Sequence, residues 1–291
     1  MPWYIFALLS NFSWGLGSQF YALYSKKISP VWTNIFKGTF AGILFTITVL
    51  LTGGFSSIPW QGAALFMLSG FIGLGLGDIF LLKSFSVIGT SRTIMLSAFS
   101  PLFVGVMSYF AFGQTVNKTK LLSIIFLIIC VLIFSLENYR KTSRWDFKIM
   151  LIALLGVFLD GVGVVISRTA FNISALGTME ANVYRCLGAA LSFLIITRVF
   201  KIQFFTRLKK LSKRALVTLC AGTFVGSYLC LTFYLAAIKT GHLATVAAMI
   251  TTGVIFAAFF ECLIQKKWPS KYLLAAFAFF LCAIYILFAT G

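Results

Sequence analysis

Two aspartates in apolar stretches, Asp78 and Asp160, are the residues best suited to chemistry in this sequence. Asp160 lies near the middle of the apolar segment 148–171, with no basic residue within one helical turn of it. A carboxylic acid in such surroundings is costly to ionise, which suits proton exchange or the binding of a cation. Asp160 is therefore the first candidate for coupling, with a hydrogen-bonded structural aspartate as the alternative. For Asp78, a structural ion pair and a role in substrate binding both stay open.

Basic and aromatic residues in other apolar stretches could complete a binding site. Lys37 and Arg185 each lie early in a predicted membrane helix, where they could meet a carboxylate or a phosphate. Trp14 and Tyr228 could enclose a quaternary ammonium or an aromatic metabolite, although ordinary packing accounts for most aromatic residues here. We expect Trp14, Asp160 and Tyr228 to lie near a substrate. Lys37 and Arg185 are expected to be charged partners toward opposite membrane faces.

The composition places these residues in a membrane protein. Of 291 residues, 60% are hydrophobic and 10% are charged, whereas a soluble domain carries about a quarter charged residues. Apolar stretches of about 20 residues, long enough to cross a bilayer, follow one another with little chain between them. They are continuous rather than alternating, so the predicted fold class is an all-α integral membrane protein with ten transmembrane helices. The predicted helices cover 3–25, 31–52, 62–83, 91–112, 119–137, 148–171, 178–199, 215–238, 243–264 and 271–290.

The chain is predicted to be a duplicated unit. The pattern Asn-x-aromatic-basic occurs at Asn34 to Lys37 and again at Asn182 to Arg185. Repeats separated by half the chain indicate a duplication. Because each unit holds five helices, an odd number, the second unit inserts upside down, and the repeats are predicted at 1–143 and 144–291. A second echo, 152 positions apart, pairs Gly70 with Gly222, Gly89 with Gly241 and Pro101 with Gly253.

Pro101 and Gly253 are predicted to mark kinks near the middle of their helices. Proline removes a backbone donor and glycine loosens a helix, so each is a candidate kink beside a central cavity. Relief of local packing is the alternative. The G-x-x-x-G pairs that begin at Gly73 and Gly222 provide small faces for close helix contact.

Local motifs carry a resemblance to one transporter group. They are Trp14-Gly15, the basic Lys37 and Arg185, Gly77-Asp78, Ser100 to Phe103, and Phe112-Gly113. On these motifs the chain resembles the drug/metabolite transporter superfamily, specifically its ten-helix EamA-type members. It departs from their pattern at Gly113-Gln114 and Gln265-Lys266, where the family tends to have Gly-Glu, and at Gly253, which replaces a proline.

The expected function is secondary transport of a small polar or zwitterionic metabolite, such as an amino acid or amine, by alternating access. A first alternative is an intramembrane aspartyl protease that uses Asp78 and Asp160, because Gly75 to Asp78 matches the Gly-x-Gly-Asp motif. Such catalysis needs two carboxyl groups that share a proton, and we expect these two to differ in membrane depth. A second alternative is a non-transporting receptor or scaffold, which would not need inverted repeats.

The net charge of +18 does not indicate a nucleic-acid partner. Basic residues lie in short connections beside apolar stretches, and the longest basic run, Lys201 to Arg214, is predicted to rest on anionic headgroups. The six cysteines form no C-x-x-C pair, so neither a metal site nor a cofactor is expected. Expected partners are a small-molecule substrate, the lipid bilayer and a coupling proton or cation. The chain is predicted to be a monomer or weak dimer in the plasma membrane.

The distribution of basic residues also predicts an orientation. They are concentrated in the connections 26–27, 140–148, 201–214 and 266–271, whereas the opposite face has only Lys118, Lys120 and Lys239. Positive charge favours the cytoplasmic side, so both termini are predicted outside. The resemblance implies the reverse orientation. Near the outer connections, Glu180 and Arg168 are expected to pair with each other.

Overall fold

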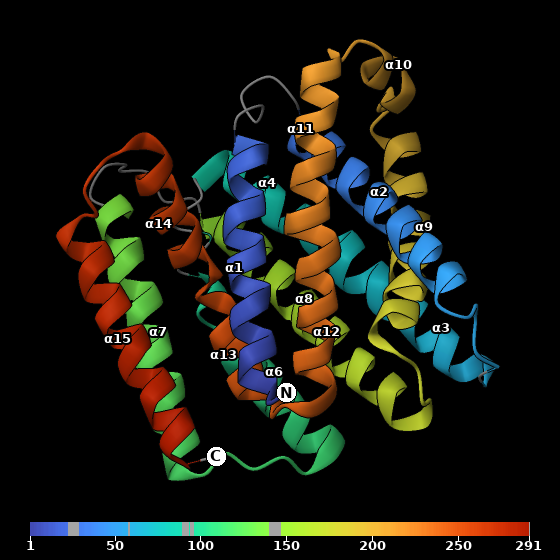
Figure 1. Ribbon diagram of the computed structural model, residues 1–291. Helices are drawn as coiled ribbons and strands as arrows, with labels where there is room; N and C mark the ends of the chain where they lie inside the picture. The colour runs from blue at the N-terminus through green and yellow to red at the C-terminus, as the bar shows by residue number, and fades with distance from the viewer. Residues whose placement is uncertain (23–28, 58, 89–92, 94–95, 140–146, 291) are drawn as a thin grey trace.

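The structure is a computed structural model that describes residues 1–22, 29–57, 59–88, 93, 96–139 and 147–290. All regular elements in these ranges are helices, which confirms the all-helical prediction (Figure 1). Six stretches are long and apolar enough to cross a membrane, and two shorter apolar helices accompany them at Ser100–Phe112 and Lys271–Ile286. The six stretches are Val31–Leu51, Trp60–Leu81, Phe147–Ile173, Thr178–Val199, Lys213–Thr240 and Leu243–Gln265.

The elements follow the chain as a series of long helices, some of them divided. They are α1 (Trp3–Ala22), α2 (Pro30–Leu51), α3 (Trp60–Ser69), η1 (Gly70–Gly77), α4 (Asp78–Ile88), α6 (Ser100–Phe112), α7 (Lys118–Tyr139), α8 (Phe147–Ile173), α9 (Thr178–Val199), α10 (Phe204–Lys209), α11 (Lys213–Thr223), η2 (Phe224–Leu229), α12 (Cys230–Thr240), α13 (Leu243–Thr251), α14 (Gly253–Gln265) and α15 (Lys271–Thr290).

Two of the long helices contain a π-helical segment at corresponding places in the two halves of the chain. The segment η1 joins α3 to α4, and η2 joins α11 to α12. Each lies in or just after one of the glycine-rich stretches that the sequence repeats, beginning at Gly70 and Gly222. Glycine tolerates the wider turn and brings neighbouring backbones close. Because π-helical turns occur often at functional sites, these two segments direct attention to their surroundings.

Two further helices are interrupted next to Pro101 and Gly253. The residue before α6, Phe99, has φ −77° and ψ −13°, and the residue before α14, Thr252, has φ −76° and ψ −4°. At both places a backbone amide donates to the carbonyl three residues earlier in the chain. Phe99 donates to Leu96 and Thr252 donates to Met249, each over 3.1 Å. The chain therefore makes a similar tight turn next to both Pro101 and Gly253, the two positions that the 152-residue echo relates.

The two halves of the chain interlace rather than stand side by side. Helix α8 of the second half packs along α3, η1 and α4 of the first, and α1 of the first half packs along α11, η2 and α12 of the second. Glycines allow both approaches: a Cβ on Gly163 would lie 3.1 Å from the Cα of Gly73. A Cβ on Gly17 would overlap Gly226. Helices α7 and α15 pair at the periphery (Figure 1).

Each π-helical segment packs against the second helix of the opposite half of the chain, η1 against α9 and η2 against α2. We call these two interfaces the closed seam and the open seam. In the closed seam, α3 and η1 lie directly against α9, where side chains on Gly70, Gly75 and Gly188 would overlap Arg185, Ser192 and Met67 respectively. In the open seam, α2 faces α11 and η2 across a crevice of about 480 Å³. The crevice is lined by Phe40, Leu44, Leu216, Val217, Cys220, Ala221 and Phe224.

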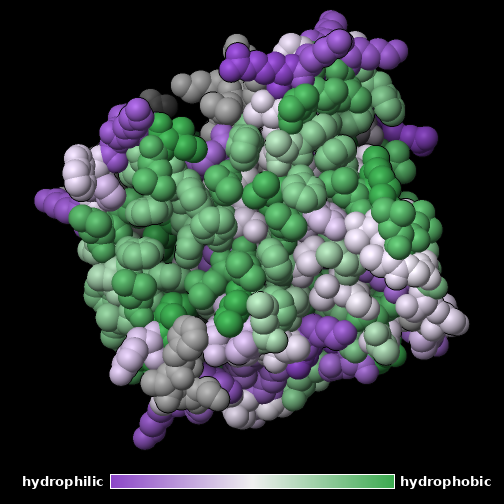
Figure 2. Space-filling view, in the orientation of Figure 1, coloured by the Kyte–Doolittle hydropathy of each residue, from purple (hydrophilic) through white to green (hydrophobic). Residues whose placement is uncertain are grey.

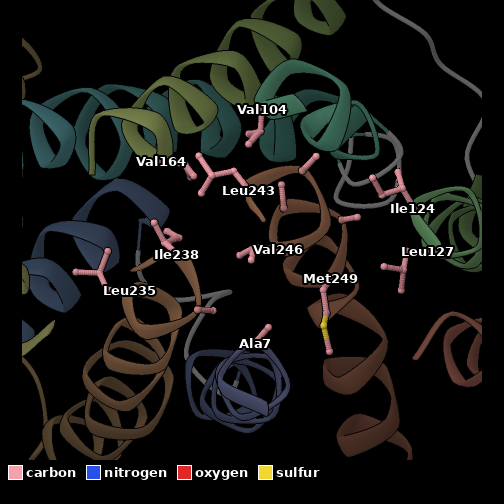
Figure 3. Packing of buried hydrophobic residues seen from close by; sticks show 14 of the residues in the cluster. Ala7, Val104, Ile124, Leu127, Val164, Leu235, Ile238, Leu243, Val246 and Met249 are labelled. Carbon is pink, nitrogen blue, oxygen red and sulfur yellow. The ribbon is translucent and has the colours of Figure 1, made fainter. Parts of the chain in front are cut away.

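The largest buried hydrophobic cluster lies where α1, α6, α12 and α13 meet, close to Trp3. Leu235 and Ile238 of α12 pack there with Val246 and Met249 of α13 and with Ala7 of α1 (Figure 3). Outside this cluster, large hydrophobic side chains are exposed over much of the surface. Figure 2 shows them as a broad band, with hydrophilic side chains gathered mainly along the upper and lower edges. Such a surface suits lipid around the middle and water at both ends.

The structure does not describe one sequence-based expectation and contradicts another. The predicted boundary between residues 143 and 144 lies outside the described residues. The expected pairing of Glu180 with Arg168 is wrong. Glu180 accepts hydrogen bonds from the amide and hydroxyl of Ser56, both over 2.9 Å, and Arg168 donates to backbone carbonyls of α12.

Candidate functional site

A cluster of charged side chains lies at the junction of the two halves. Asp78 begins α4 directly after η1, and Lys37 and Arg185 are its cationic neighbours, with Asn34 also beside it. Lys37 is seven residues after the first residue of α2, as Arg185 is after the first residue of α9. The repeat thus brings one basic group to the same acid from each half. Although the two bases belong to helices of opposite halves, both act on Asp78.

Asp160 of α8 belongs to the same cluster. Its charged neighbours are Asp78 and Arg185. The helix is held against η1 by glycines: a Cβ on Gly73 would lie 3.7 Å from Asp160 Oδ1, and one on Gly77 would lie 3.3 Å from its backbone nitrogen. The expectation that Asp78 and Asp160 differ in depth is therefore wrong. The cluster contains two acids and two bases, so its formal charges balance.

Arg185 is fixed in place, but its hydrogen-bonding capacity is not fully used. Its side chain is only 1% exposed, and its Nε donates to Ser69 Oγ over 3.2 Å. Its guanidinium carbon lies 5.8 Å from the centre of the Tyr234 ring. Nη1 has no hydrogen-bond partner. Since a buried unpaired donor is costly, this nitrogen is a place where a bound acceptor would gain most.

Two serines next to Arg185 connect α3, α8 and α9 through hydrogen bonds. Ser69 of α3 donates to the carbonyl of Gly163 over 2.8 Å, and its oxygen lies 2.6 Å from Ser167 Oγ of α8. Both serines are fully buried. They therefore orient the guanidinium of α9 relative to the helix that carries Asp160.

Tyr234 of α12 is a member of the cluster that sequence reasoning did not single out as a site residue. Its electrostatic neighbours are Asp160, Arg185, Cys230 and Asp78. No spacing along its own helix points to the acids of other helices. Its ring lies beside the guanidinium of Arg185, in reach of a cation–π contact.

The carboxyl groups of Asp78 and Asp160 lie deep in the protein. Even so, both residues keep part of their surface exposed, as do Lys37 and Tyr234. Surface exposed at such depth faces internal space rather than lipid. The cluster is therefore not completely enclosed by protein atoms.

Trp14 and Tyr228 have their contacts with other parts of the structure. Trp14 of α1 is 38% exposed, and its ring would lie 3.4 Å from a Cβ on Gly253, beside the break before α14. Tyr228 of η2 belongs to the open seam. Its hydroxyl lies 2.8 Å from Thr48 Oγ1, and its ring centre lies 4.7 Å from that of Phe45.

Asn11 holds the break between α13 and α14, a role the sequence did not reveal. Its amide nitrogen donates to the carbonyl of Met249 over 2.8 Å and to Thr252 Oγ1 over 3.1 Å. The Met249 carbonyl also accepts from the amide and hydroxyl of Thr252, so Asn11 joins α1 to a turn that is already closed by its own hydrogen bonds. The side chain of Asn11 is 2% exposed, so it makes these bonds within the protein.

The end of the protein that carries Trp3 is held shut by polar contacts between helices. Arg168 of α8 donates to the carbonyls of Ile238, over 2.7 Å, and of Lys239 on α12. In turn Lys239 Nζ donates to the carbonyl of Leu176 over 2.7 Å. These contacts lie within the second half, where the polypeptide leaves α8 and α12.

His242 and Gln114 extend these contacts to α6 and α13. His242 Nε2 donates to the carbonyl of Thr115 over 3.1 Å, and Gln114 Oε1 accepts from the amide of Leu243 over 3.0 Å. Burial lowers the pKa of His242, the nearby Lys120 lowers it further, and the bond to Thr115 opposes them. The imidazole therefore stays neutral at physiological pH. In the described part of the chain, no group of three His, Cys, Asp or Glu residues could hold a metal ion.

Comparisons with known proteins agree with this two-part architecture. The profile of the EamA-like transporter family matches residues 1–136 and again residues 147–289. The chain belongs to the EamA-like transporter family. As a member, it is a multi-pass membrane protein built from two repeats.

Solved structures show that this EamA-like chain has a known fold. One of them, described only as "Crystal structure of protein", superimposes with a TM-score of 0.79 at 12% sequence identity. The match covers 98% of this chain and 96% of that chain. No curated protein sequence matches this chain significantly. At such low identity the likeness concerns the fold alone.

Proposed function

We propose that this protein is a secondary transporter that moves a small polar or zwitterionic metabolite across the plasma membrane by alternating access. The observation that carries the proposal is the charge-balanced cluster of Lys37, Asp78, Asp160 and Arg185 between two π-helical segments. Ionisable groups inside membrane helices are costly and mark substrate or ion pathways. A substrate with one positive and one negative group would replace the internal pairs without leaving a charge unbalanced.

Alternating access follows from ten crossings arranged as two inverted repeats, divided between residues 143 and 144. In this proposal α1, α7 and α15 are crossings together with the six longest apolar stretches, and the helix interrupted before α6 is the tenth. Inverted repeats exchange their conformations, so a barrier at one end implies an equivalent barrier at the other end in a second state. The contacts of His242 with Thr115 and of Gln114 with Leu243, which join the two halves, support a state shut at the Trp3 end.

A first experiment identifies the substrate. The purified protein is screened against amino acids, amines, nucleotide sugars and other metabolites by thermal shift, because a ligand that binds the folded state raises its stability. Hits are then tested for uptake into proteoliposomes under proton, sodium and potassium gradients. A protein that moves none of these classes under any gradient would not be the transporter proposed here.

The role of Asp160 is tested next, with Glu261 as the control. Asp160→Asn keeps most hydrogen-bonding capacity but cannot ionise, so we expect folded protein with initial uptake reduced at least tenfold and a flattened pH profile. Glu261 lies at an exposed helix end and accepts only from Gln265, so Glu261→Gln should transport normally. A wild-type rate and pH profile in Asp160→Asn would leave Asp160 a structural role.

The remaining elements of the proposal have their own tests. Both termini are placed outside on the charge distribution, and a C-terminal fluorescent-protein fusion that is bright in the cytoplasm would contradict this. The protein is proposed to act as a monomer or weak dimer.

The family match gives no support to the aspartyl protease. Cleavage of a membrane peptide that Asp78→Asn abolishes would nevertheless favour it.

A further inference from the structure

The open seam carries an inference that is independent of transport. Its crevice lies between α2 and α11 on the outside of the helix bundle, and every residue that lines it is apolar or cysteine. Its volume of about 480 Å³ is within the range of about 300–1,000 Å³ that small-molecule sites occupy. Val217 is 67% exposed and Phe224 45% exposed. In a membrane protein, surface of this kind is open to lipid chains.

Basic side chains stand directly above this crevice. Lys213 and Arg214 begin α11 and are exposed, and residues three, four, seven and eight positions after Lys213 line the crevice. Helical residues at these spacings share one face, and their side chains lean toward the helix N-terminus. At 1.5 Å per residue, Phe224 lies about 16 Å below Lys213. That is half of a hydrocarbon core of about 30 Å.

The short helix α10 completes the basic group and is fixed to the same seam. Trp32 of α2 is fully buried, donates to the carbonyl of Phe204 over 3.1 Å and stacks on its ring. This attachment brings the exposed Arg207, Lys209 and Lys210 to the top of the seam. Figure 2 shows hydrophilic side chains over the upper edge, in the region of α10 and the start of α11, above a hydrophobic surface. No acidic residue occurs between 201 and 220.

We propose that the open seam is a binding site for an anionic phospholipid, with one acyl chain in the crevice and the phosphate on Lys213 and Arg214. Charge selects the headgroup, because a zwitterionic lipid would bring its own cation to a basic group that has no acid nearby. A second copy of the chain fits poorly, since symmetrical pairing would place this basic group against itself. The lipid fills the space that α2 and α11 leave beside their contact at Leu219, so it stabilises the conformation described here.

Native mass spectrometry of the delipidated full-length protein tests this directly. The protein is titrated with phosphatidylglycerol and with phosphatidylcholine of the same acyl chains. We expect phosphatidylglycerol to bind at least fivefold more tightly to the wild-type protein. The variant Lys213→Gln/Arg214→Gln should lose about tenfold in its affinity for phosphatidylglycerol. The matched control Lys266→Gln/Lys267→Gln removes two exposed charges from another connection and should bind as wild type.

The acyl part of the site needs a separate measurement. Ala221→Phe fills the crevice and should weaken binding of phosphatidylglycerol as much as loss of the two charges does. If this variant does not fold, the wild-type Cys220 serves instead. Bound phosphatidylglycerol should protect Cys220 from a thiol reagent at least fivefold, while the exposed Cys282 reacts unchanged.

Several results would overturn the proposal. Equal losses in the two charge variants would mean general attraction to the basic surface. Equal binding of phosphatidylcholine would remove the role of charge. Full displacement of the lipid by soluble glycerol phosphate, or no protection of Cys220, would mean a headgroup site without an acyl chain. Protection of Cys220 that depends on protein concentration without lipid would indicate a second copy instead.

Discussion

The closed and open seams are built from corresponding parts of the two repeats, yet they pack differently. In the closed seam the backbones of η1 and α9 meet through Gly70 and Gly188. In the open seam η2 touches α2 through the ring of Tyr228, α11 touches it through Leu219 against Trp32 and Phe36, and an apolar crevice lies open at the surface between them. One sequence pattern thus supports two geometries within one molecule. In the alternating-access mechanism proposed above, the two seams would exchange their packing between states.

The largest predicted effect concerns the glycines of the closed seam. Gly70→Ala and Gly188→Ala each place a methyl group on a backbone carbonyl of the facing helix, which cannot move away without separating the helices. We expect each to destabilise the protein by about 3 kcal/mol and to lower the unfolding temperature by about 10 °C. Ala221→Leu adds more bulk to the open seam and should change it by about 2 °C or less. Thermal unfolding in detergent measures all three, and equal losses would mean that the seams do not differ.

Asn11→Ala should have the next largest effect, on the side of the open seam. The amide joins α1 to the break between α13 and α14, and its removal leaves the buried carbonyl of Met249 without that donor. The expected cost is about 1–2 kcal/mol of unfolding free energy. Asn11→Asp is the informative companion, since it keeps the shape but exchanges the donor for a charge. Stability equal to wild type in both variants would show that the break needs no support from α1.

Tyr228→Phe removes the hydroxyl that joins η2 to α2. Thr48 also donates to the carbonyl of Leu44, so it keeps a partner, and the cost should be about 1 kcal/mol. Combining the change with Thr48→Val gives a double-mutant cycle for the hydrogen bond. If Tyr228 contacts substrate instead, Tyr228→Phe will weaken ligand binding far more than it lowers stability.

The smallest effect is a pH dependence at the closed end. The pKa of His242 is lowered in the folded protein, so below about pH 6.5 the unfolded chain binds the proton more readily and folding is penalised. We expect the unfolding temperature to fall by about 1–2 °C more in wild type than in His242→Gln between pH 7.5 and 5.5. A larger fall in His242→Gln would mean that His242 is not the responsible group.

Sequence reasoning located features that depend on backbone chemistry and missed those that depend on contacts between repeats. Pro101 and Gly253 stand out because their types alter a helix wherever they occur, and the chain is indeed interrupted next to both. Tyr234 and Asn11 acquire their roles from residues on other helices, far away in sequence. No pattern along their own helices indicates those neighbours.

Errors about ionisable residues have a similar origin. The depths of Asp78 and Asp160 were judged by counting along upright helices, whereas α3 and α8 are inclined relative to α1 and α11 (Figure 1). Glu180 and Arg168 were expected to pair because they are close in sequence. A loop amide and the carbonyls at the end of α12 satisfy them instead, and single-sequence patterns do not place backbone groups of distant elements.

The pairing of α7 with α15 at the periphery has a consequence for the synthesis of the protein in the membrane. Helix α7 ends at Tyr139, and its partner begins at Lys271. At about 5–20 residues per second, a ribosome needs about 7–26 s to make the intervening chain. During that interval α7 stands in the membrane without its partner. A nascent chain that stops before α15 therefore displays an incomplete edge that a quality-control protease or an insertion chaperone can recognise.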